Sequence, residues 1–283
     1  MAKNILFYCF VGLILGISLT SCKTEFERTR ISGDPELIYN KAYEYYEKGD
    51  YDKSQALFEL VIPAYRGKKE LEDIYFKYAY TYYNQKKFIL SSYYFRNFST
   101  TFPNSELREE AEYMSAFSNY QMSPSYRLDQ TNTEKAIDEF QLFINTFPES
   151  KRVDDANRLI DESRRKLEKK VYAEGELYYN LRQYQASVLV FQNLLKDYPE
   201  TPNGEQIRYM ITAASFYLAE NSVIDKQLER YRDVERYANE YLAKYEENSS
   251  NRKEINTMLE QSTRKIKNLE NERYQNQSAG TGS

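Results

Sequence analysis

The sequence predicts an all-α protein in which pairs of helices stack as repeats. One spacing occurs four times: a small residue is followed by apolar residues four and seven positions later. Residues at these intervals lie on one face of a helix, so each copy predicts a helix with a buried face. In three copies proline stands at the twelfth position, where it ends a helix. The small residues are Ser54, Ser91, Ala136 and Ser187, and the prolines are Pro103, Pro148 and Pro199.

The composition agrees with a helical protein and narrows its partners. Seven prolines and nine glycines are few for 283 residues, which favours helices over β-sheet. Lys3 is the only charged residue among the first 21, so the remaining chain has 38 basic and 43 acidic side chains. A slightly acidic chain without a basic block speaks against nucleic acid as a partner.

The amino terminus predicts export and lipid attachment. Lys3 precedes an apolar run that ends at Leu19, too short to span a membrane comfortably, and it fits a signal peptide over residues 1–21. The four residues ending at Cys22 are similar to the lipobox of bacterial lipoproteins, which implies cleavage before Cys22 and several acyl chains on it. The alternative is an ordinary signal peptide with a chance cysteine. Residues 22–34 are polar, and we expect an extended, lipidated tether reaching about 40 Å.

The helices begin at Asp34, because aspartate followed by Pro35 is typical of a helix start. We expect a first helix to about Lys48, a turn, and a second helix over residues 51–61. This pair resembles a tetratricopeptide repeat, in which small and aromatic residues recur at fixed positions around a turn. The residues that carry the resemblance are Ala42, Tyr45, Gly49, Tyr51, Ser54, Phe58 and Val61.

Further copies of this motif imply a tetratricopeptide-repeat solenoid of about five helical pairs. The second copy is the most complete, and the fifth is degenerate. In the third copy, the two helices are separated by a polar insertion over residues 121–133, about ten residues longer than the repeat requires. The copies after the first span residues 75–103, 105–148, 175–199 and 205–245.

One segment departs from the repeat period. From Val153 onward, apolar residues continue at helical spacing without a proline or cap, which predicts one long helix of about thirty residues. It would join an amino-terminal half, residues 35–149 with repeats one to three, to a carboxy-terminal half, residues 150–246 with repeats four and five. In residues 247–283 we expect a last, mostly polar helix and a disordered tail from Gln275.

Nine aromatic residues form a candidate peptide-binding groove. In tetratricopeptide repeats, certain positions of the first helix line the inner surface, and nine such positions are aromatic in the first three repeats. This surface could hold an extended apolar or aromatic peptide, with phenolic hydroxyls bonding its backbone. Alternatively, the rings fill gaps between tightly stacked repeats, and the sequence leaves both interpretations open. The nine are Tyr39, Tyr43, Tyr46, Phe76, Tyr80, Tyr83, Tyr113, Phe117 and Tyr120.

The chain as a whole resembles the BamD family, the lipoproteins of the outer-membrane β-barrel assembly (BAM) complex. The resemblance rests on the lipobox, the tether, the five repeats, and proline after an aromatic residue at Pro103, Pro148 and Pro199. It implies a scaffold that is anchored by lipid to the outer membrane, on the periplasmic face. Its implied partners are unfolded outer-membrane proteins and the periplasmic POTRA domain of the barrel subunit BamA.

The same resemblance implies partner-binding residues. Residues 193–199 resemble the segment by which family members meet the barrel subunit, which implies contacts by Lys196 and Asp197. The insertion resembles an arginine- and aspartate-bearing loop of the family, represented here by Arg127 and Asp129; the alternative is a loop held by a local ion pair. The family often has arginine where Lys196 stands. The bidentate ion pair that arginine can form with a carboxylate would then be replaced by a single contact from the lysine ammonium. The helix expected after residue 251 also departs from the family core.

No enzyme is expected. The chain has no histidine, its first cysteine leaves with the signal peptide, and Cys22 would be capped by lipid. The usual groups for acid–base catalysis, nucleophilic attack and zinc binding are therefore missing. We interpret the carboxylate pairs Glu109-Glu110 and Asp154-Asp155 as solvated surface, and we expect no catalytic residue, metal or cofactor. Two other functions stay open: a glycan-binding lipoprotein of a nutrient-uptake system, although this chain lacks the usual tryptophan platform, and a general repeat adaptor in the cell envelope.

Overall fold

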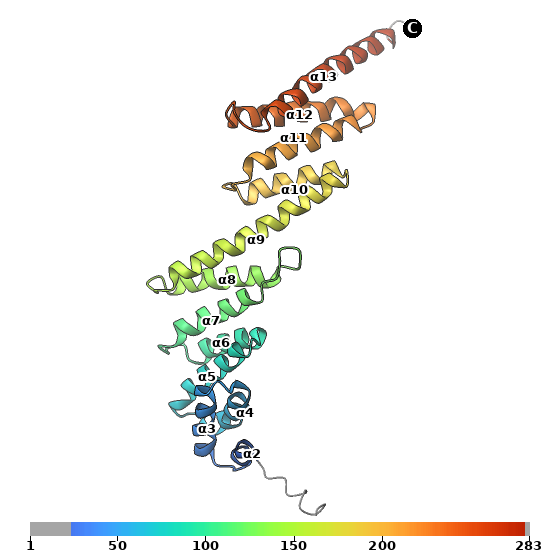
Figure 1. Cartoon of the computed structure of the whole chain (residues 1–283). Helices are drawn as coiled ribbons and strands as arrows, with labels where there is room; N and C mark the ends of the chain where they lie inside the picture. The colour runs from blue at the N-terminus through green and yellow to red at the C-terminus, as the bar shows by residue number, and fades with distance from the viewer. Residues whose placement is uncertain (1–23, 281–283) are drawn as a thin grey trace, which may run out of the picture. The chain divides into compact units, whose positions relative to one another are not determined.

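The structure is a computed structural model that describes residues 24–280 and is built from α-helices (Figure 1). Twelve α-helices and one short 3₁₀-helix occupy the described residues, which contain no strand. The predicted all-α fold of the tetratricopeptide-repeat class is confirmed. The predicted signal peptide and Cys22 lie outside the described residues.

Ten of these helices form five consecutive pairs, each joined by a turn or loop. The short helix α2 (Glu25–Arg30) precedes the first pair, the 3₁₀-helix η1 (Ile62–Tyr65) follows that pair, and α13 (Arg252–Gly280) follows the fifth. The predicted long helix is α9, with 28 residues. The pairs are α3 (Pro35–Glu47) with α4 (Tyr51–Val61), α5 (Glu70–Asn84) with α6 (Phe88–Thr101), α7 (Arg108–Gln121) with α8 (Thr131–Thr146), α9 (Val153–Asn180) with α10 (Tyr184–Asp197), and α11 (Gly204–Glu220) with α12 (Ile224–Lys244).

Contacts between Cα atoms divide the described chain into two compact units. Unit 1 comprises residues 24–123 and 131–160, and unit 2 comprises residues 124–130 and 161–280. The helix α9 therefore gives its first eight residues to unit 1 and the remainder to unit 2. The loop 124–130 belongs with unit 2, although the helices that it joins belong to unit 1. The domain boundaries given above stay a prediction, since grouping by contacts does not measure independent folding.

The turns inside three of the pairs share one backbone conformation. Their middle residues, Gly49, Lys86 and Arg182, have φ values of 77°, 58° and 59°. Glycine is the usual residue in this left-handed helix cap, because a Cβ atom makes the conformation costly. The next residue donates its N–H to a tyrosine carbonyl near the helix end, over 2.9 Å in each turn: Asp50 to Tyr45, Lys87 to Tyr82 and Gln183 to Tyr178.

In the first and fourth pairs, the small residue of the repeated spacing lies directly against the backbone of the other helix. The Ser54 hydroxyl donates to the Ala42 carbonyl over 2.9 Å, and the Ser187 hydroxyl donates to the Gly175 carbonyl over the same distance. This close approach lets the side chains at the fourth and seventh positions fill the space between the helices. All eight are at most 1% exposed, as the spacing predicts: Phe58, Val61, Phe95, Phe98, Phe140, Phe143, Phe191 and Leu194.

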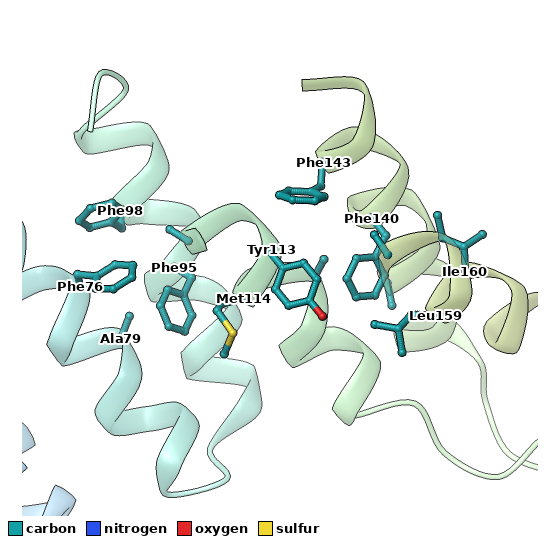
Figure 2. Close-up of a cluster of buried hydrophobic side chains, with 14 residues drawn as sticks. Phe76, Ala79, Phe95, Phe98, Tyr113, Met114, Phe140, Phe143, Leu159 and Ile160 are labelled. Carbon is teal, nitrogen blue, oxygen red and sulfur yellow. The ribbon is translucent and has the colours of Figure 1, made fainter. Parts of the chain in front are cut away.

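Figure 2 shows the core of unit 1 that these side chains build. Phe95 and Phe98 of α6 lie against Phe76 of α5, and Phe140 and Phe143 of α8 lie against Tyr113 of α7, which is a ring contact from one helix of a pair to the other. Met114 of α7 and Leu159 and Ile160 of α9 belong to the same cluster. The core of unit 1 is therefore continuous from the second pair to the start of α9.

Two sequence expectations about the chain ends are wrong. The segment expected to be an extended tether contains α2, because Thr24 caps this helix through a hydrogen bond from the Glu27 N–H and Phe26 packs on Tyr45. The tail expected to be disordered from Gln275 continues α13 to residue 280. Few glycines and no proline interrupt this part of the chain, so the helix propagates beyond its packed segment.

We predict that Gly175→Ala destabilises the protein by about 1–3 kcal/mol. A Cβ atom on Gly175 would lie 2.7 Å from ring atoms of the fully buried Phe191. This clash outweighs the gain of about 1 kcal/mol in helix propensity. Urea denaturation followed by circular dichroism measures the difference. The matched control is Gly204→Ala, whose Cβ would meet the movable Arg208 side chain at 3.2 Å; a Gly175→Ala chain at least as stable as this control contradicts the packing argument.

Candidate functional site

The structure brings the nine candidate groove residues together along the first helices of the three pairs in unit 1. Phe76 and Tyr113 are only 9% and 3% exposed. They contact core phenylalanines at centroid distances of 5.2–5.9 Å (Figure 2). These two rings therefore contribute to the hydrophobic core. The other seven are half-buried: Tyr39, Tyr43, Tyr46, Tyr80, Tyr83, Phe117 and Tyr120.

The half-buried rings pack against one another as well as on the core. Tyr39 stacks on Tyr65 with ring centroids 5.1 Å apart. The ring centroid of Tyr83 lies 6.2 Å from that of Phe117 in the next pair. Phe117 and Tyr120 are nearly parallel at 6.0 Å. Each of these rings thus keeps part of its surface exposed while neighbouring rings fix its position. A row of fixed rings can present apolar surface without losing much side-chain entropy on binding.

Three tyrosines among the nine candidate residues donate hydrogen bonds to carboxylates of the following pair. Tyr80 of α5 donates to Glu110 of α7 over 2.6 Å. Tyr43 of α3 donates in the same way to Asp73 of α5, and Tyr113 of α7 donates to Asp155 of α9. We call these three bonds the tyrosine–carboxylate ladder. Each rung links the first helices of consecutive pairs, so the ladder ties the stack together along one face.

Arg152 joins two rungs of the ladder. Its guanidinium forms an ion pair with Glu110 and lies 4.4 Å from the ring centroid of Tyr113. Asp155 in turn accepts a hydrogen bond from Arg158. Two carboxylates of the ladder, Glu110 and Asp155, are therefore paired with arginines, and the ring of Tyr113 is held by charge as well as by packing.

Burial and the ladder both raise tyrosine pKa values. Burial raises the pKa of Tyr80 strongly, and the bond to Glu110 raises it further because the phenol must keep its proton to donate. Tyr43 and Tyr113 shift in the same direction for the same two causes. Burial also raises the pKa of Tyr46 to about 12. The bond from Tyr113 lowers the pKa of Asp155, since it favours the charged carboxylate.

A second set of polar contacts repeats at the loops between pairs. A hydroxyl that follows the aromatic–proline motif donates to a glutamate of the first helix of the preceding pair. It also accepts the backbone N–H of the residue two positions later. The same kind of contact occurs before α13, where Ser249 donates to Glu205 over 2.7 Å. The motif hydroxyls and their acceptors are Ser105 to Glu72, Ser150 to Glu109 and Thr201 to Glu168.

The interpretation of the two carboxylate pairs as solvated surface is wrong for three of the four residues. Glu109 accepts from Ser150, Glu110 accepts from Tyr80 and Arg152, and Asp155 accepts from Tyr113. Their partners are about 30 to 40 residues away in sequence, so a reading of one helix at a time could not find them. The available signal was the recurrence of acidic residues in the first turn of α5, α7 and α9.

The four candidate partner-binding residues lie exposed in unit 2. Lys196 and Asp197 end α10, and Arg127 and Asp129 lie in the loop 124–130. Arg127 lies over the Tyr126 ring at 5.4 Å, and the Gln130 amide donates to the carbonyls of Ser125 and Leu128. Hydrogen bonds from the Gln130 side chain to the loop's own carbonyl groups therefore hold the loop in shape.

A short stretch of α9 contacts the loop 124–130 and the loop that follows α10. Lys170 donates to the Leu128 carbonyl over 2.7 Å, and Lys169 lies over the Tyr126 ring at 4.7 Å. The adjacent Glu168, only 9% exposed, accepts from Thr201 in the loop after α10. The structure thus connects the insertion and the end of α10 through residues 168–170, which sequence reasoning did not anticipate.

Within residues 24–280 no group of three or more histidine, cysteine, aspartate or glutamate side chains is placed to hold a metal ion. No helix among these residues is both long and apolar enough to cross a membrane.

Residues 32–230 match the model of the YfiO family, described as an outer membrane lipoprotein family. This match covers more than two thirds of the chain. The chain belongs to the YfiO family. This is the family of BamD-like outer membrane lipoproteins that the sequence resembles, so the predicted family is confirmed. The YfiO family and its repeat fold are those of non-catalytic scaffolds.

Among solved structures, the TPR2AB domain of yeast Sti1, in a complex with pHSP90, is similar to this YfiO-family chain. The identity is 10%, the TM-score is 0.37, and the alignment covers 81% of this chain and 98% of that chain. A search of curated proteins finds no match.

We predict that Tyr80→Phe destabilises the protein by about 1–2 kcal/mol, because it removes a hydrogen bond to a charged acceptor. Tyr83→Phe is the matched control. Tyr83 is a half-buried tyrosine of the same helix, and its hydroxyl donates to no described residue, so we expect a change below about 0.5 kcal/mol. Thermal unfolding followed by circular dichroism measures both. Equal effects of the two substitutions would mean that the ladder adds nothing to stability.

We predict that stability falls steeply as the pH rises above about 10. The pKa values of Tyr43, Tyr46, Tyr80 and Tyr113 in the folded protein exceed the unfolded value of about 10. The contribution of these four tyrosines to the free energy of unfolding is therefore fully present below about pH 10 and is lost as the pH rises through the folded pKa values. Melting temperatures measured between about pH 8 and pH 12, with tyrosinate absorbance recorded alongside, test this. A melting temperature that stays constant to the upper limit would show that the burial of these hydroxyls is not linked to stability.

Proposed function

We propose that this protein is a lipid-anchored scaffold of the outer-membrane β-barrel assembly complex on the periplasmic face of the outer membrane. The observation that carries the proposal is the match to the YfiO family over residues 32–230. The anchor would be the acylated Cys22. The protein would act by holding partners together at the membrane surface, where tethering raises their effective concentration. It would need no catalytic residue or cofactor.

Unit 1 would bind the terminal segments of unfolded outer-membrane proteins. The seven half-buried rings supply apolar surface that neighbouring rings hold in place. Aromatic residues of an extended peptide could stack on them. The protons of Tyr43 and Tyr80 are donated to carboxylates, so these half-buried hydroxyls would accept hydrogen bonds from peptide N–H groups. The contribution of Phe76 and Tyr113 to this surface would be indirect, through the core.

Unit 2 would dock on the POTRA domain of a BamA-like barrel subunit. Lys196 and Asp197 are exposed at the end of α10 and available to a partner. Arg127 and Asp129 belong to a loop that α9 holds through Lys169 and Lys170. A loop that is fixed before binding loses less conformational entropy when the partner docks.

Affinity purification from detergent extracts of the native envelope, followed by mass spectrometry, tests both assignments. The wild-type chain should recover a barrel subunit with periplasmic domains and unassembled outer-membrane proteins. Lys196→Glu should lower recovery of the barrel subunit about tenfold while leaving the unassembled proteins, because a charge reversal at an interface costs at least 1.4 kcal/mol.

Lys244→Glu is the matched control, since Lys244 is exposed in the last turn of α12 as Lys196 is in the last turn of α10. An equal loss with both variants would show a general charge effect. Recovery of a polysaccharide transporter, with no assembly subunit, would instead favour the glycan-binding alternative.

A further inference from the structure

The helix α2 runs back along α3, so the start of the described chain lies beside the end of α3. Glu25 forms an ion pair with Lys41 in the middle of α3, and Phe26 contacts Tyr45 near its end, with ring centroids 6.0 Å apart. The Tyr45 carbonyl accepts the N–H of Asp50, which closes the turn between α3 and α4. The chain before Thr24 therefore begins at the edge of unit 1 that carries the turns within its pairs.

The second such turn lies beside the first. The Gln85 amide donates to the Tyr51 carbonyl over 3.2 Å and to the Gln55 side chain over 3.0 Å. The Lys87 ammonium nitrogen also lies 3.7 Å from a carboxylate oxygen of Asp52. We call the edge made by residues 48–52 and 85–87 the turn edge of unit 1.

The distance from Cys22 to the folded chain is short. Only Lys23 separates Cys22 from Thr24, and two residues of extended chain reach about 7 Å. Under the proposed function Cys22 carries the acyl chains, and the further inference rests on that anchor. The helix α2 replaces most of the expected tether, so a bilayer that holds the acyl chains lies within contact range of the turn edge.

The start of α6 at this edge exposes an unusual amount of apolar surface. Ile89 is 74% exposed, Tyr93 is 57% exposed one helical turn later, and Leu90 beside them is 41% exposed. Lys86 and Lys87 precede them in the turn. We call these five residues the 86–93 surface. Aliphatic and tyrosine side chains flanked by lysines suit a membrane interface, where rings sit at the headgroups and lysines reach phosphate.

Most of the negative charges around the 86–93 surface lie beside lysines. Glu44 pairs with Lys48, Asp50 pairs with Lys53, and Asp52 lies near Lys87. Three of these carboxylates thus have a lysine nearby, whereas the exposed Glu47 at the end of α3 pairs with no cation among the described residues. Lys86 adds a positive charge at the tip of the second turn, where its backbone has a φ of 58°.

We propose that the 86–93 surface rests on the phospholipid headgroups and orients unit 1 on the membrane. The acyl chains hold the turn edge at the bilayer, and Ile89, Leu90 and Tyr93 enter the headgroup region. The opposite edge, where the loops between pairs lie, then faces away from the lipid. This contact makes the orientation of the half-buried aromatic row independent of any protein partner.

Tryptophan fluorescence can test the contact, because the chain has no tryptophan of its own. The lipidated full-length chain with Ile89→Trp is reconstituted into vesicles of phosphatidylethanolamine and phosphatidylglycerol, with or without brominated acyl chains. We expect a blue-shifted emission that loses most of its intensity with brominated lipid. The matched control is Leu60→Trp, which replaces another exposed apolar residue, 47% exposed, at the far end of α4; its emission should not change.

Charge reversal supplies a second readout. In the Ile89→Trp chain, Lys86→Glu with Lys87→Glu should restore most of the fluorescence lost to brominated lipid. Lys68→Glu with Lys69→Glu, another adjacent exposed pair in unit 1, should not restore it.

The outcomes separate the anchor from the contact. A chain that floats with the vesicles but shows no quenching at position 89, or equal quenching at positions 60 and 89, overturns the contact and leaves the anchor standing. A chain with an intact lipobox that does not float with the vesicles overturns the anchor of the proposed function, and the contact with it.

Discussion

The close approach of two helices at one small residue is the constraint on which the rest of this structure depends. Where Ser54 bonds the Ala42 carbonyl, or Ser187 bonds the Gly175 carbonyl, no larger side chain fits between the backbones. The phenylalanines one turn later then fill the remaining space and exclude water. Each pair buries its own apolar face in this way, and the next pair packs mainly on the second helix of the pair before it. A repeat built like this contacts only its neighbours, so pairs can be added without redesign of the core.

Polar contacts then fix how consecutive pairs meet. The tyrosine–carboxylate ladder links first helices along one face, and the hydroxyl after each aromatic–proline motif links a loop to the preceding pair. Apolar packing alone has little directional preference, whereas a hydrogen bond to a carboxylate needs a definite distance and angle. The ladder therefore sets the register of the stack. It also places carboxylates beside the half-buried rings, so the proposed peptide surface would be amphipathic.

The position of α2 changes how the anchored protein would work. A long extended tether would let the folded part turn freely above the membrane, and any orientation would have to come from partners. With the helix packed on α3, the link from Cys22 to the fold is two residues. If Cys22 carries the proposed acyl chains, such a short link would make one edge of unit 1 a neighbour of the bilayer. The exposed Ile89 and Tyr93 are then explained by lipid rather than left as unpaired apolar surface.

The sequence by itself determined the fold class, the five pairs, the long helix α9 and the eight core side chains of the repeated spacing. Those features follow from local rules: the spacing of apolar residues, the caps and the prolines. The sequence also carried the family through the same repeated motifs. Only the tertiary structure decided which rings are buried, as for Phe76 and Tyr113, and which acidic residues have partners, as for Glu110 and Asp155. It also decided that residues 25–30 fold back on α3. These outcomes depend on contacts between residues that are 16 to 42 positions apart, and the chain shows such neighbours only after the pairs have stacked.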